Sequence, residues 1–332
     1  MDWYEREKRD LPWRATRDPY CILVSEIMLQ QTRAQTVIPY YRRFLKRFPD
    51  ARSLAKAREA DVLALWSGLG YYSRARNLQR AACVVADKGS FPQTYDAIRE
   101  LAGVGPYTAA AVASIAFGAP HAVLDANVMR VIARLRGDGA DLRSARTRAR
   151  LQRIADELLD LCDPGTFNQA MMELGATVCA PKSPKCVVCP VAQFCEAHQT
   201  GRQNELPVKG RKRAAERIKR EVALVIRNDH LLVRRRAAAE SLMPGFWEVP
   251  EPGELPGWIR GKVVGSFRHT ITHHYYTIQV VTGELAAAPR GLTWRSIRTL
   301  DRIPLTTISR KAVGLLRRIP APKQVTVPVK SP

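Results

Sequence analysis

Residues 101–135 read LAGVGPYTAAAVASIAFGAPHAVLDANVMRVIARL, and this stretch decides how the rest of the chain is interpreted. The turn Gly103-Val104-Gly105 leads into an alanine-rich helix predicted to begin at Pro106, because proline suits the first helical position. Glycines allow close backbone approach, and the free N–H groups of a helix start can grip a phosphate. A second helix is predicted to open at Asp125-Ala126-Asn127. A phosphate grip followed by a carboxylate indicates chemistry on a polynucleotide, although Asp125 is equally explained as a helix cap.

The composition points to an anionic partner. The 332 residues include 53 Lys and Arg against 31 Asp and Glu, which gives a formal net charge of +22. Charge that far from zero attracts polyanions, and nucleic acid is the commonest of these. The sequence contains no apolar run of the roughly 18 residues that a membrane span needs. Its first residues, MDWYEREKRD, are charged and include no apolar signal core, so we do not expect secretion.

The hydrophobic periodicity and the composition change along the sequence in a way that predicts two domains. Helical periodicity runs through residues 1–199 without a convincing strand, which predicts an all-α domain. Residues 200–220 carry eight basic residues against two acidic ones and read as a basic linker. Residues 221–318 predict a smaller α+β domain: Asn228-Asp229 between two apolar runs is a hairpin signal, with further strands at 262–268 and 275–282 and a helix at 309–318. The proline-rich residues 319–332 are expected to be disordered.

Four of the seven cysteines fall within 17 residues, at Cys179, Cys186, Cys189 and Cys195. Four thiolates so close in sequence can surround one soft metal centre. A structural zinc site favours two close pairs separated by a longer gap, whereas the steps here are long, short and medium. The spacing therefore favours a [4Fe–4S] cluster, with zinc as the competing interpretation. The remaining cysteines, including Cys162, are expected to be inert core thiols.

Glu26 stands out without any comparison. It follows Ile22 and Leu23 by four and three positions, so it shares their apolar helix face. A carboxyl group there loses solvation, its neutral form is favoured and its pKa rises. Raised far enough, it can serve as a general acid near neutral pH. The alternative is a buried glutamate paired with one of the many arginines.

Five stretches carry a family resemblance: LPWR at 11–14, VSEIMLQQT at 24–32, WSGLGYYSRARNL at 66–78, LDANVMRV at 124–131 and FNQAMMELGATVC at 167–179. With the cysteine spacing and the Gly-Val-Gly turn, they resemble the endonuclease III superfamily of helix–hairpin–helix DNA glycosylases. Within it they are similar to the adenine DNA glycosylases of the MutY family. The resemblance implies a mainly α glycosylase domain with an iron–sulfur cluster loop at 179–195, followed by a smaller, α+β, Nudix-like domain.

The resemblance also implies catalytic roles. Glu26 would protonate the adenine leaving group, and Asp125 would stabilise the oxocarbenium-like sugar or bond to it transiently. Tyr107 and Asn127 would hold the geometry of Asp125. Relatives that also cut the strand carry a lysine nucleophile where this chain has Tyr107, so no amine is present there to form a Schiff base. We therefore expect a monofunctional reaction that stops at base removal.

Further residues would handle the duplex, because chemistry on a paired base requires that nucleotide to be rotated out of the stack. By resemblance, Gln31 and Tyr71 intercalate beside the opposing base. Arg74 and Arg76 suit phosphate contacts, although an exposed arginine is more often only solvated surface. The remaining assignments are Trp13, Arg14 and Glu173 to the adenine pocket, Gln30 and Thr32 to the duplex, and Gly103 and Gly105 to the phosphate grip.

The second domain resembles the one that recognises 8-oxoguanine opposite the target adenine. Thr272 and His273 align with the lesion-reading loop, where Ile271 replaces the usual aromatic residue. A working Nudix hydrolase needs a carboxylate-bearing helix for Mg²⁺. Prolines at 250, 252 and 256 disfavour that helix, so we do not expect pyrophosphate hydrolysis.

Together these features predict a monomeric, cytoplasmic, nucleoid-associated bacterial enzyme. Its partner would be double-stranded DNA with adenine opposite 8-oxoguanine or guanine. Two alternatives stay open: an endonuclease III-like glycosylase/lyase for oxidised pyrimidines, and a non-catalytic, metal-stabilised nucleic-acid-binding protein. Tyr107 and the second domain argue against the first. Glu26 and Asp125 fit the second poorly, because carboxylates repel phosphate unless they do chemistry.

Overall fold

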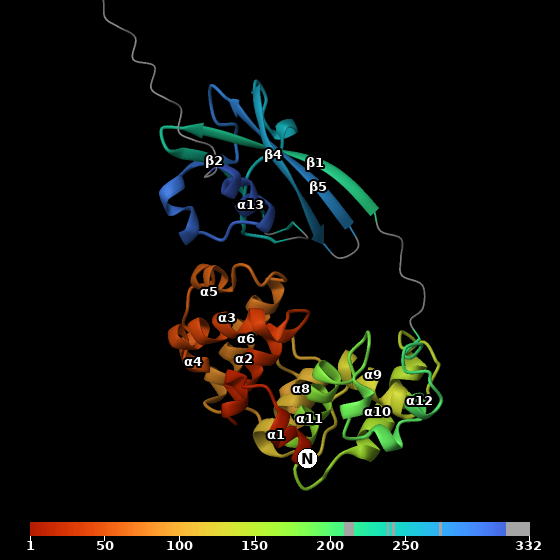
Figure 1. Cartoon of the computed structure of the whole chain (residues 1–332). Helices are drawn as coiled ribbons and strands as arrows, with labels where there is room; N and C mark the ends of the chain where they lie inside the picture. The colour runs from red at the N-terminus through yellow and green to blue at the C-terminus, as the bar shows by residue number, and fades with distance from the viewer. Residues whose placement is uncertain (209–215, 238, 241–242, 272–273, 317–332) are drawn as a thin grey trace, which may run out of the picture. The chain divides into compact units, whose positions relative to one another are not determined.

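The computed structural model describes residues 1–208, 216–237, 239–240, 243–271 and 274–316. The chain divides into two compact units, Met1–Lys212 and Arg213–Pro332 (Figure 1). Thr272 and His273, assigned above to lesion reading, lie outside the described residues, as does the stretch 319–332 that we expected to be disordered.

Every regular element among the described residues of the first unit is a helix, which confirms the predicted all-α architecture. Its α-helices are α1 (Asp2–Glu7), α2 (Pro19–Leu29), α3 (Ala34–Arg47), α4 (Ala51–Ala55), α5 (Glu59–Trp66), α6 (Ser73–Lys88), α7 (Tyr95–Arg99), α8 (Pro106–Phe117), α9 (Ala126–Leu135), α10 (Ala145–Leu158), α11 (Pro164–Thr177) and α12 (Glu196–Gln199). Short 3₁₀ helices are η1 (Pro12–Ala15), η2 (Cys186–Val188) and η3 (Ala192–Phe194).

The predicted helical hairpin forms around the turn Gly103-Val104-Gly105, which lies between α7 and α8. Helix α8 begins at Pro106 with Gly105 as its N-cap, and it ends where Gly118 adopts a left-handed conformation. Gly103 in the preceding turn has φ +78°, and a Cβ there would lie 2.6 Å from the side chain of Asn77. Only glycine accepts both constraints at low cost.

Helices α9 and α11 approach each other closely at one glycine. A Cβ on Gly175 of α11 would lie 2.6 Å from the Cβ of Asn127 at the start of α9. Small residues allow two helix backbones to come together, so this contact fixes the distance between the two helices. The start of α9 is thereby held against α11.

One cysteine prediction is wrong. Cys162 lies in the turn between α10 and α11 and is exposed, because that turn runs over the surface.

The second unit is a mixed α+β domain, as predicted. Its sheet has the strand order β3-β2-β1-β5-β4, with β6 pairing with β2. The strands are β1 (Glu216–Arg227), β2 (His230–Arg235), β3 (Trp247–Glu248), β4 (Ile259–Ile271), β5 (His274–Glu284) and β6 (Leu292–Ser296). The helical segments are η4 (Pro252–Glu254), η5 (Ile297–Arg302) and α13 (Thr307–Leu316). Only the short η4 forms among the prolines that disfavoured a helix.

The predicted hairpin forms between β1 and β2. Asn228 and Asp229 have φ +47° and +58°, and Ile226 pairs with Leu231 across the turn. This is the two-residue turn with positive φ that Asn and Asp favour. Strand β1 starts at Glu216, within the stretch predicted as linker, because its first residues pair in parallel with β5 from His274 onward.

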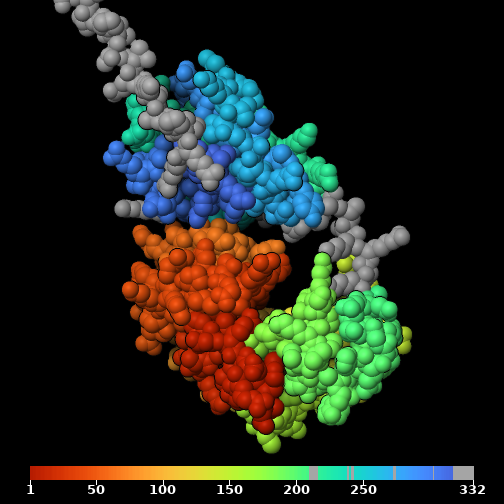
Figure 2. Space-filling model, viewed as in Figure 1, coloured from red at the N-terminus to blue at the C-terminus, as the bar shows by residue number. Residues whose placement is uncertain are grey.

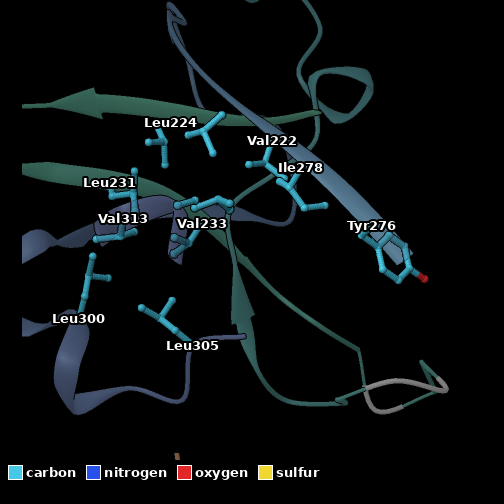
Figure 3. Close-up of a cluster of buried hydrophobic side chains, with 12 residues drawn as sticks. Val222, Leu224, Leu231, Val233, Tyr276, Ile278, Leu300, Leu305 and Val313 are labelled. Carbon is cyan, nitrogen blue, oxygen red and sulfur yellow. The ribbon is translucent and has the colours of Figure 1, made fainter. Parts of the chain in front are cut away.

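Apolar side chains from the sheet and α13 form the core of the second unit. Figure 3 shows Val222 and Leu224 of β1, Ile278 of β5 and Val313 of α13 gathered on one side of the sheet. Alternate residues of a strand face the same side, so Val222 and Leu224 enter this core together. The intervening Ala223 belongs to a second cluster on the other face.

Candidate active site

A cavity of about 1130 Å³ lies within the first unit. Its walls come from η1, α2 and the turn that follows it, α8, the start of α9 and α11. Figure 2 shows the start of the chain, in red, lying against yellow-green residues of the same unit. Ten residues that the sequence analysis singled out line this one cavity: Trp13, Arg14, Glu26, Gln30, Gln31, Thr32, Tyr107, Asp125, Asn127 and Glu173.

Glu26 is buried in the wall of this cavity, with 5% of its surface exposed. Burial raises the pKa of its carboxyl group to about 7, while a hydrogen bond from Tyr107 opposes the rise. The Tyr107 hydroxyl donates to Glu26 Oε2 at 2.7 Å. We expected Tyr107 to hold Asp125, but its hydroxyl bonds to Glu26 instead. Glu26 is therefore partly protonated at neutral pH and can deliver a proton.

Asp125 lines the same cavity and is also the N-cap of α9. Its Oδ1 accepts from the backbone N–H of Val128 at 2.7 Å, and its Oδ2 accepts from Asn127 Nδ2 at 2.8 Å. Burial raises the pKa of Asp125, and these two hydrogen bonds oppose that rise. A helix N-terminus also favours negative charge. The capping role and the place in the cavity are thus compatible.

Arg130 connects the start of α9 to the cysteine loop. Its Nη2 donates to Asn127 Oδ1 at 2.9 Å and to the Gly175 carbonyl at 2.7 Å. Its Nε donates to the carbonyl of Cys179 at 2.8 Å. The amide of Asn127 is therefore held on one side by Arg130 and donates to Asp125 on the other.

Glu173 is completely buried, and both of its carboxylate oxygens accept hydrogen bonds from arginine side chains. Its oxygens accept from Arg9 Nε and Nη2, both at 2.7 Å, and from Arg14 Nη2 at 2.6 Å. Burial would raise its pKa, but the two arginines lower it to about 2. Sequence reasoning missed Arg9, whose only signal is its place in the charged run just before LPWR.

The residues assigned to the duplex lie at the edge of the cavity and beyond it. Gln31 and Tyr71 both have positive φ, at +56° and +48°, and both are exposed. Tyr71 is not among the cavity residues, and neither are Gly103 and Gly105. Arg74, which we expected at phosphates, is only 8% exposed, because its guanidinium binds backbone carbonyls. Its proposed phosphate contact is therefore wrong.

The four clustered cysteines line one small cavity of about 20 Å³ together with Arg134. Arg134 Nη1 donates to Cys179 Sγ at 3.2 Å, and its buried Nη2 has no acceptor among the described residues. Four thiol donors beside an unsatisfied guanidinium nitrogen fit an anionic thiolate-bound centre. Among the residues that the structure describes, no group of three or more His, Cys, Asp or Glu side chains is arranged as a site for one metal ion.

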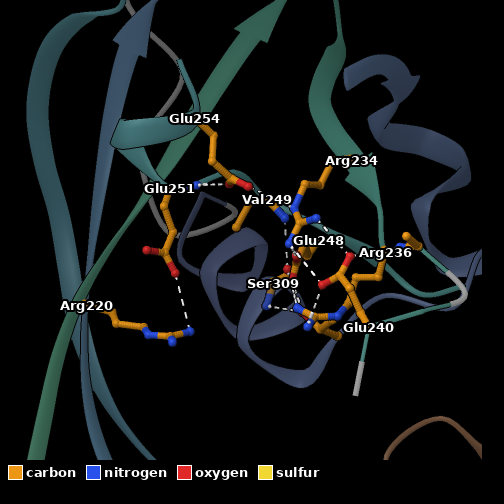
Figure 4. Close-up of polar contacts among 11 residues, drawn as sticks. Arg220, Arg234, Arg236, Glu240, Glu248, Val249, Glu251, Glu254 and Ser309 are labelled. Carbon is orange, nitrogen blue, oxygen red and sulfur yellow. Dashed lines mark hydrogen bonds and ion pairs between the residues drawn. The ribbon is translucent and has the colours of Figure 1, made fainter. Parts of the chain in front are cut away.

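A second cavity, of about 400 Å³, lies in the second unit, and several residues of an arginine–glutamate cluster line it. Figure 4 shows Arg234 and Arg236 surrounded by Glu240, Glu248 and Glu254. Arg234 binds Glu240 and Glu254, each at 3.0 Å, and also Glu248. Arg236 binds Glu240 at 2.7 Å and Glu248 at 2.6 Å. Each of these carboxylates thus contacts at least one guanidinium.

The family model described as "HhH-GPD superfamily base excision DNA repair protein" matches residues 24–157. A solved thermostable thymine-DNA glycosylase is 33% identical, with a TM-score of 0.55, and the match covers 60% of this chain and 93% of that one. The chain belongs to the HhH-GPD superfamily.

This HhH-GPD chain is also similar to curated adenine DNA glycosylases. It is 47% identical over 217 residues to that of Mus musculus, a match covering 62% of this chain and 42% of the relative. It is 37% identical over 216 residues to that of Buchnera aphidicola subsp. Acyrthosiphon pisum, covering 64% and 62%. The chain thus spans about two-fifths of the mouse relative's length. A trapped endonuclease III–DNA covalent intermediate, 22% identical with a TM-score of 0.51, shares the fold of the first unit.

Within the described residues, no helix combines the length and the apolar character needed to cross a membrane.

Proposed function

We propose that this HhH-GPD protein is a monofunctional adenine DNA glycosylase. Its substrate would be double-stranded DNA in which adenine is mispaired with 8-oxoguanine or guanine. The observation that carries the proposal is the pairing of Glu26 and Asp125 in one cavity, with the Tyr107 hydroxyl on Glu26. The resemblance to adenine DNA glycosylases supports the choice of base.

In the proposed reaction, the extruded adenine nucleotide enters the cavity. The carboxyl group of Glu26 donates its proton to the base as the glycosidic bond breaks, and the bonding electrons leave with the adenine. The carboxylate of Asp125, held by Asn127 and by the start of α9, stabilises the positive charge that develops on the sugar, or bonds to it transiently. A water molecule then adds to the sugar, its proton passes to the carboxylate of Glu26, and an abasic site results.

Two further features shape the proposal. Tyr107 occupies the position of the lysine nucleophile in strand-cutting relatives, so no Schiff base forms there and the strand stays intact. The Arg9–Arg14–Glu173 group would form a rigid, charged wall for the adenine pocket, because each oxygen of Glu173 already has a donor.

The cysteine loop would hold a [4Fe–4S] cluster through Cys179, Cys186, Cys189 and Cys195. When bound, the cluster would supply iron–thiolate bonds that cross-link residues 179–195. Arg134 Nη1 would donate to the sulfur of Cys179, and its Nη2, which has no acceptor among the described residues, would lie near the negatively charged thiolates. The colour of the purified protein distinguishes such a cluster from zinc.

The second unit would recognise the base opposite the adenine, with Thr272 and His273 as the proposed reading residues. We place the enzyme in the bacterial cytoplasm at the nucleoid, acting as a monomer.

The test uses end-labelled duplexes that carry adenine opposite 8-oxoguanine, guanine or thymine. We expect strand cleavage only after alkali, on the first two duplexes and not on the third. Borohydride added during a single turnover should trap no protein–DNA adduct. Absence of alkali-labile sites on both mispaired duplexes would refute the proposed activity, and cleavage without alkali together with efficient trapping would favour a glycosylase/lyase.

A further inference from the structure

Arg74 sits inside the first unit with its charge turned toward backbone oxygens. The residue lies in the first turn of α6 and is buried. Its Nη1 donates to the carbonyls of Ile27 and Met28, at 2.9 and 3.0 Å, and to that of Gln30, at 2.6 Å. These carbonyls end α2, where the helix leaves its last acceptors unpaired and carries partial negative charge.

The other arm of the guanidinium reaches a second segment. Arg74 Nη2 donates to the carbonyls of Leu69 and Gly70 at 3.1 and 3.2 Å. The guanidinium also lies 5.5 Å from the ring centroid of Tyr71 and from that of Trp66. One side chain therefore ties the end of α2 to the loop between α5 and α6, two segments about 40 residues apart in the sequence.

Each of these segments carries an exposed, strained residue. Gln31 follows the end of α2 with φ +56°, and Tyr71 follows Gly70 with φ +48°. Residues other than glycine rarely adopt a positive φ. They keep it only where contacts with the surrounding structure hold the backbone in place. The Arg74 hydrogen bonds to Gln30 and Gly70 act on the residue directly before each of them.

We propose that Arg74 is a positioning residue that holds Gln31 and Tyr71 in one fixed relative arrangement, ready to enter a duplex as a pair. This inference rests on the proposed function, in which both side chains enter the DNA stack. A planar guanidinium serves two groups of carbonyls at once, whereas a lysine ammonium presents a single point charge with no fixed fork. The charge alone is therefore not sufficient.

The experiment compares the full-length protein with Arg74→Met, Arg74→Lys and Arg80→Met. Arg80 is an exposed arginine on the same helix, so its substitution controls for the loss of one positive charge. Hydrogen exchange of residues 27–33 and 68–72 is measured without DNA. Binding is measured on a duplex with adenine opposite 8-oxoguanine and on a fully paired duplex, with 2-aminopurine beside the target adenine as the reporter of unstacking.

We expect Arg74→Met to speed exchange in both segments together and to lower the 2-aminopurine signal. Affinity for the mispaired duplex should fall while affinity for the fully paired duplex stays the same, a split that general destabilisation would not produce. The excision rate should fall by about 100-fold, the scale on which misplaced positioning groups act. Arg74→Lys should restore little of this, and Arg80→Met should behave like the wild type. If Arg74→Met fails to fold, Arg74→Lys carries the same comparison.

Unchanged exchange in both segments, full rescue by lysine, or equal loss of affinity for both duplexes would overturn the inference. The two proposals can fail separately. If the wild-type protein excises no adenine, the proposed reaction is refuted. If Arg74→Met still speeds exchange in both segments and lowers the 2-aminopurine signal in that case, the positioning role is supported.

Discussion

The cavity of the first unit and the arginine–glutamate cluster of the second unit both contain arginines and glutamates, but only the cavity contains a glutamate whose pKa is raised. In the cluster, each carboxylate contacts a guanidinium; burial alone would raise the pKa of Glu240, but a backbone N–H and Arg234 lower it. In the cavity, Glu173 is matched in the same way, and its pKa falls to about 2. Glu26 has a tyrosine hydroxyl instead of an arginine, and its pKa rises to about 7.

The partner of each carboxyl group decides whether that group can transfer a proton. A carboxylate surrounded by guanidinium groups stays charged over the whole physiological range and serves structure. A buried carboxyl group without such a partner can hold and release a proton near neutral pH. Among these glutamates, only Glu26 has the second environment.

The largest expected effect comes from Asp125→Asn. Asparagine caps a helix as well as aspartate, so α9 and duplex binding should persist. Loss of the charge that stabilises the developing cation should slow adenine excision by about 1000-fold. Single-turnover excision and duplex binding measure the two properties separately, and activity near the wild-type level would remove Asp125 from the reaction.

Glu26→Gln should lower excision by about 100-fold or more, because the proton donor is lost. In the wild type, the rate should fall as pH rises through about 7, since only the protonated form donates. A rate that is flat across this range would contradict the assignment.

The same substitution should increase stability at high pH. The folded-state pKa of Glu26 is raised from 4.5, so its contribution to stability is fully present below that pH and is lost as pH rises through about 7. Glutamine avoids this loss, which is worth about 3 kcal/mol at most. Urea unfolding at about pH 5 and about pH 8 should therefore show the variant gaining on the wild type only at the higher pH.

Arg234→Met tests the matched side of the comparison. It leaves Glu240, Glu248 and Glu254 close together with fewer cations, so we expect the second unit to lose about 2 kcal/mol of stability. Arg235→Met, on the same strand, is the matched control, because its guanidinium lies over the ring of Trp247. Equal destabilisation by both variants would mean that matching of charge does not hold this cluster together.

The smallest effect is expected from Arg14→Met. Arg14 lowers the pKa of Glu26 by its charge, so removing it should move the falling limb of the pH–rate profile upward. The shift should be less than about one pH unit, because Arg14 acts on Glu26 by charge alone across a partly solvated cavity. A downward shift would show that Arg14 acts on the profile through another group.

Local signals in the sequence were sufficient for much of the fold. Pro106 begins a helix, and Asn228-Asp229 turns a hairpin, because each acts through its own backbone preference. The apolar face around Glu26 likewise predicted its burial.

Long-range contacts could not be predicted in the same way. Arg9 and Glu173 are 164 residues apart, and nothing local links them. Arg74 and Arg76 look alike in the sequence, yet Arg74 binds buried carbonyls while Arg76 pairs with Glu59. Which arginine is buried depends on where α2 and the loop before α6 end in space. The bond from the Tyr107 hydroxyl to Glu26 likewise depends on how α8 and α2 pack, which the local sequence does not show.

The close approach at Gly175 has a consequence for reading variants of this chain. Any side chain at that position would push Asn127, and with it the amide that donates to Asp125, although Gly175 itself has no side chain that could react. A substitution there would leave every reactive atom present and yet misalign them. Its kinetics would resemble those of a variant of Glu26 or Asp125, although the substituted residue lies on α11 and is not one of the groups that react.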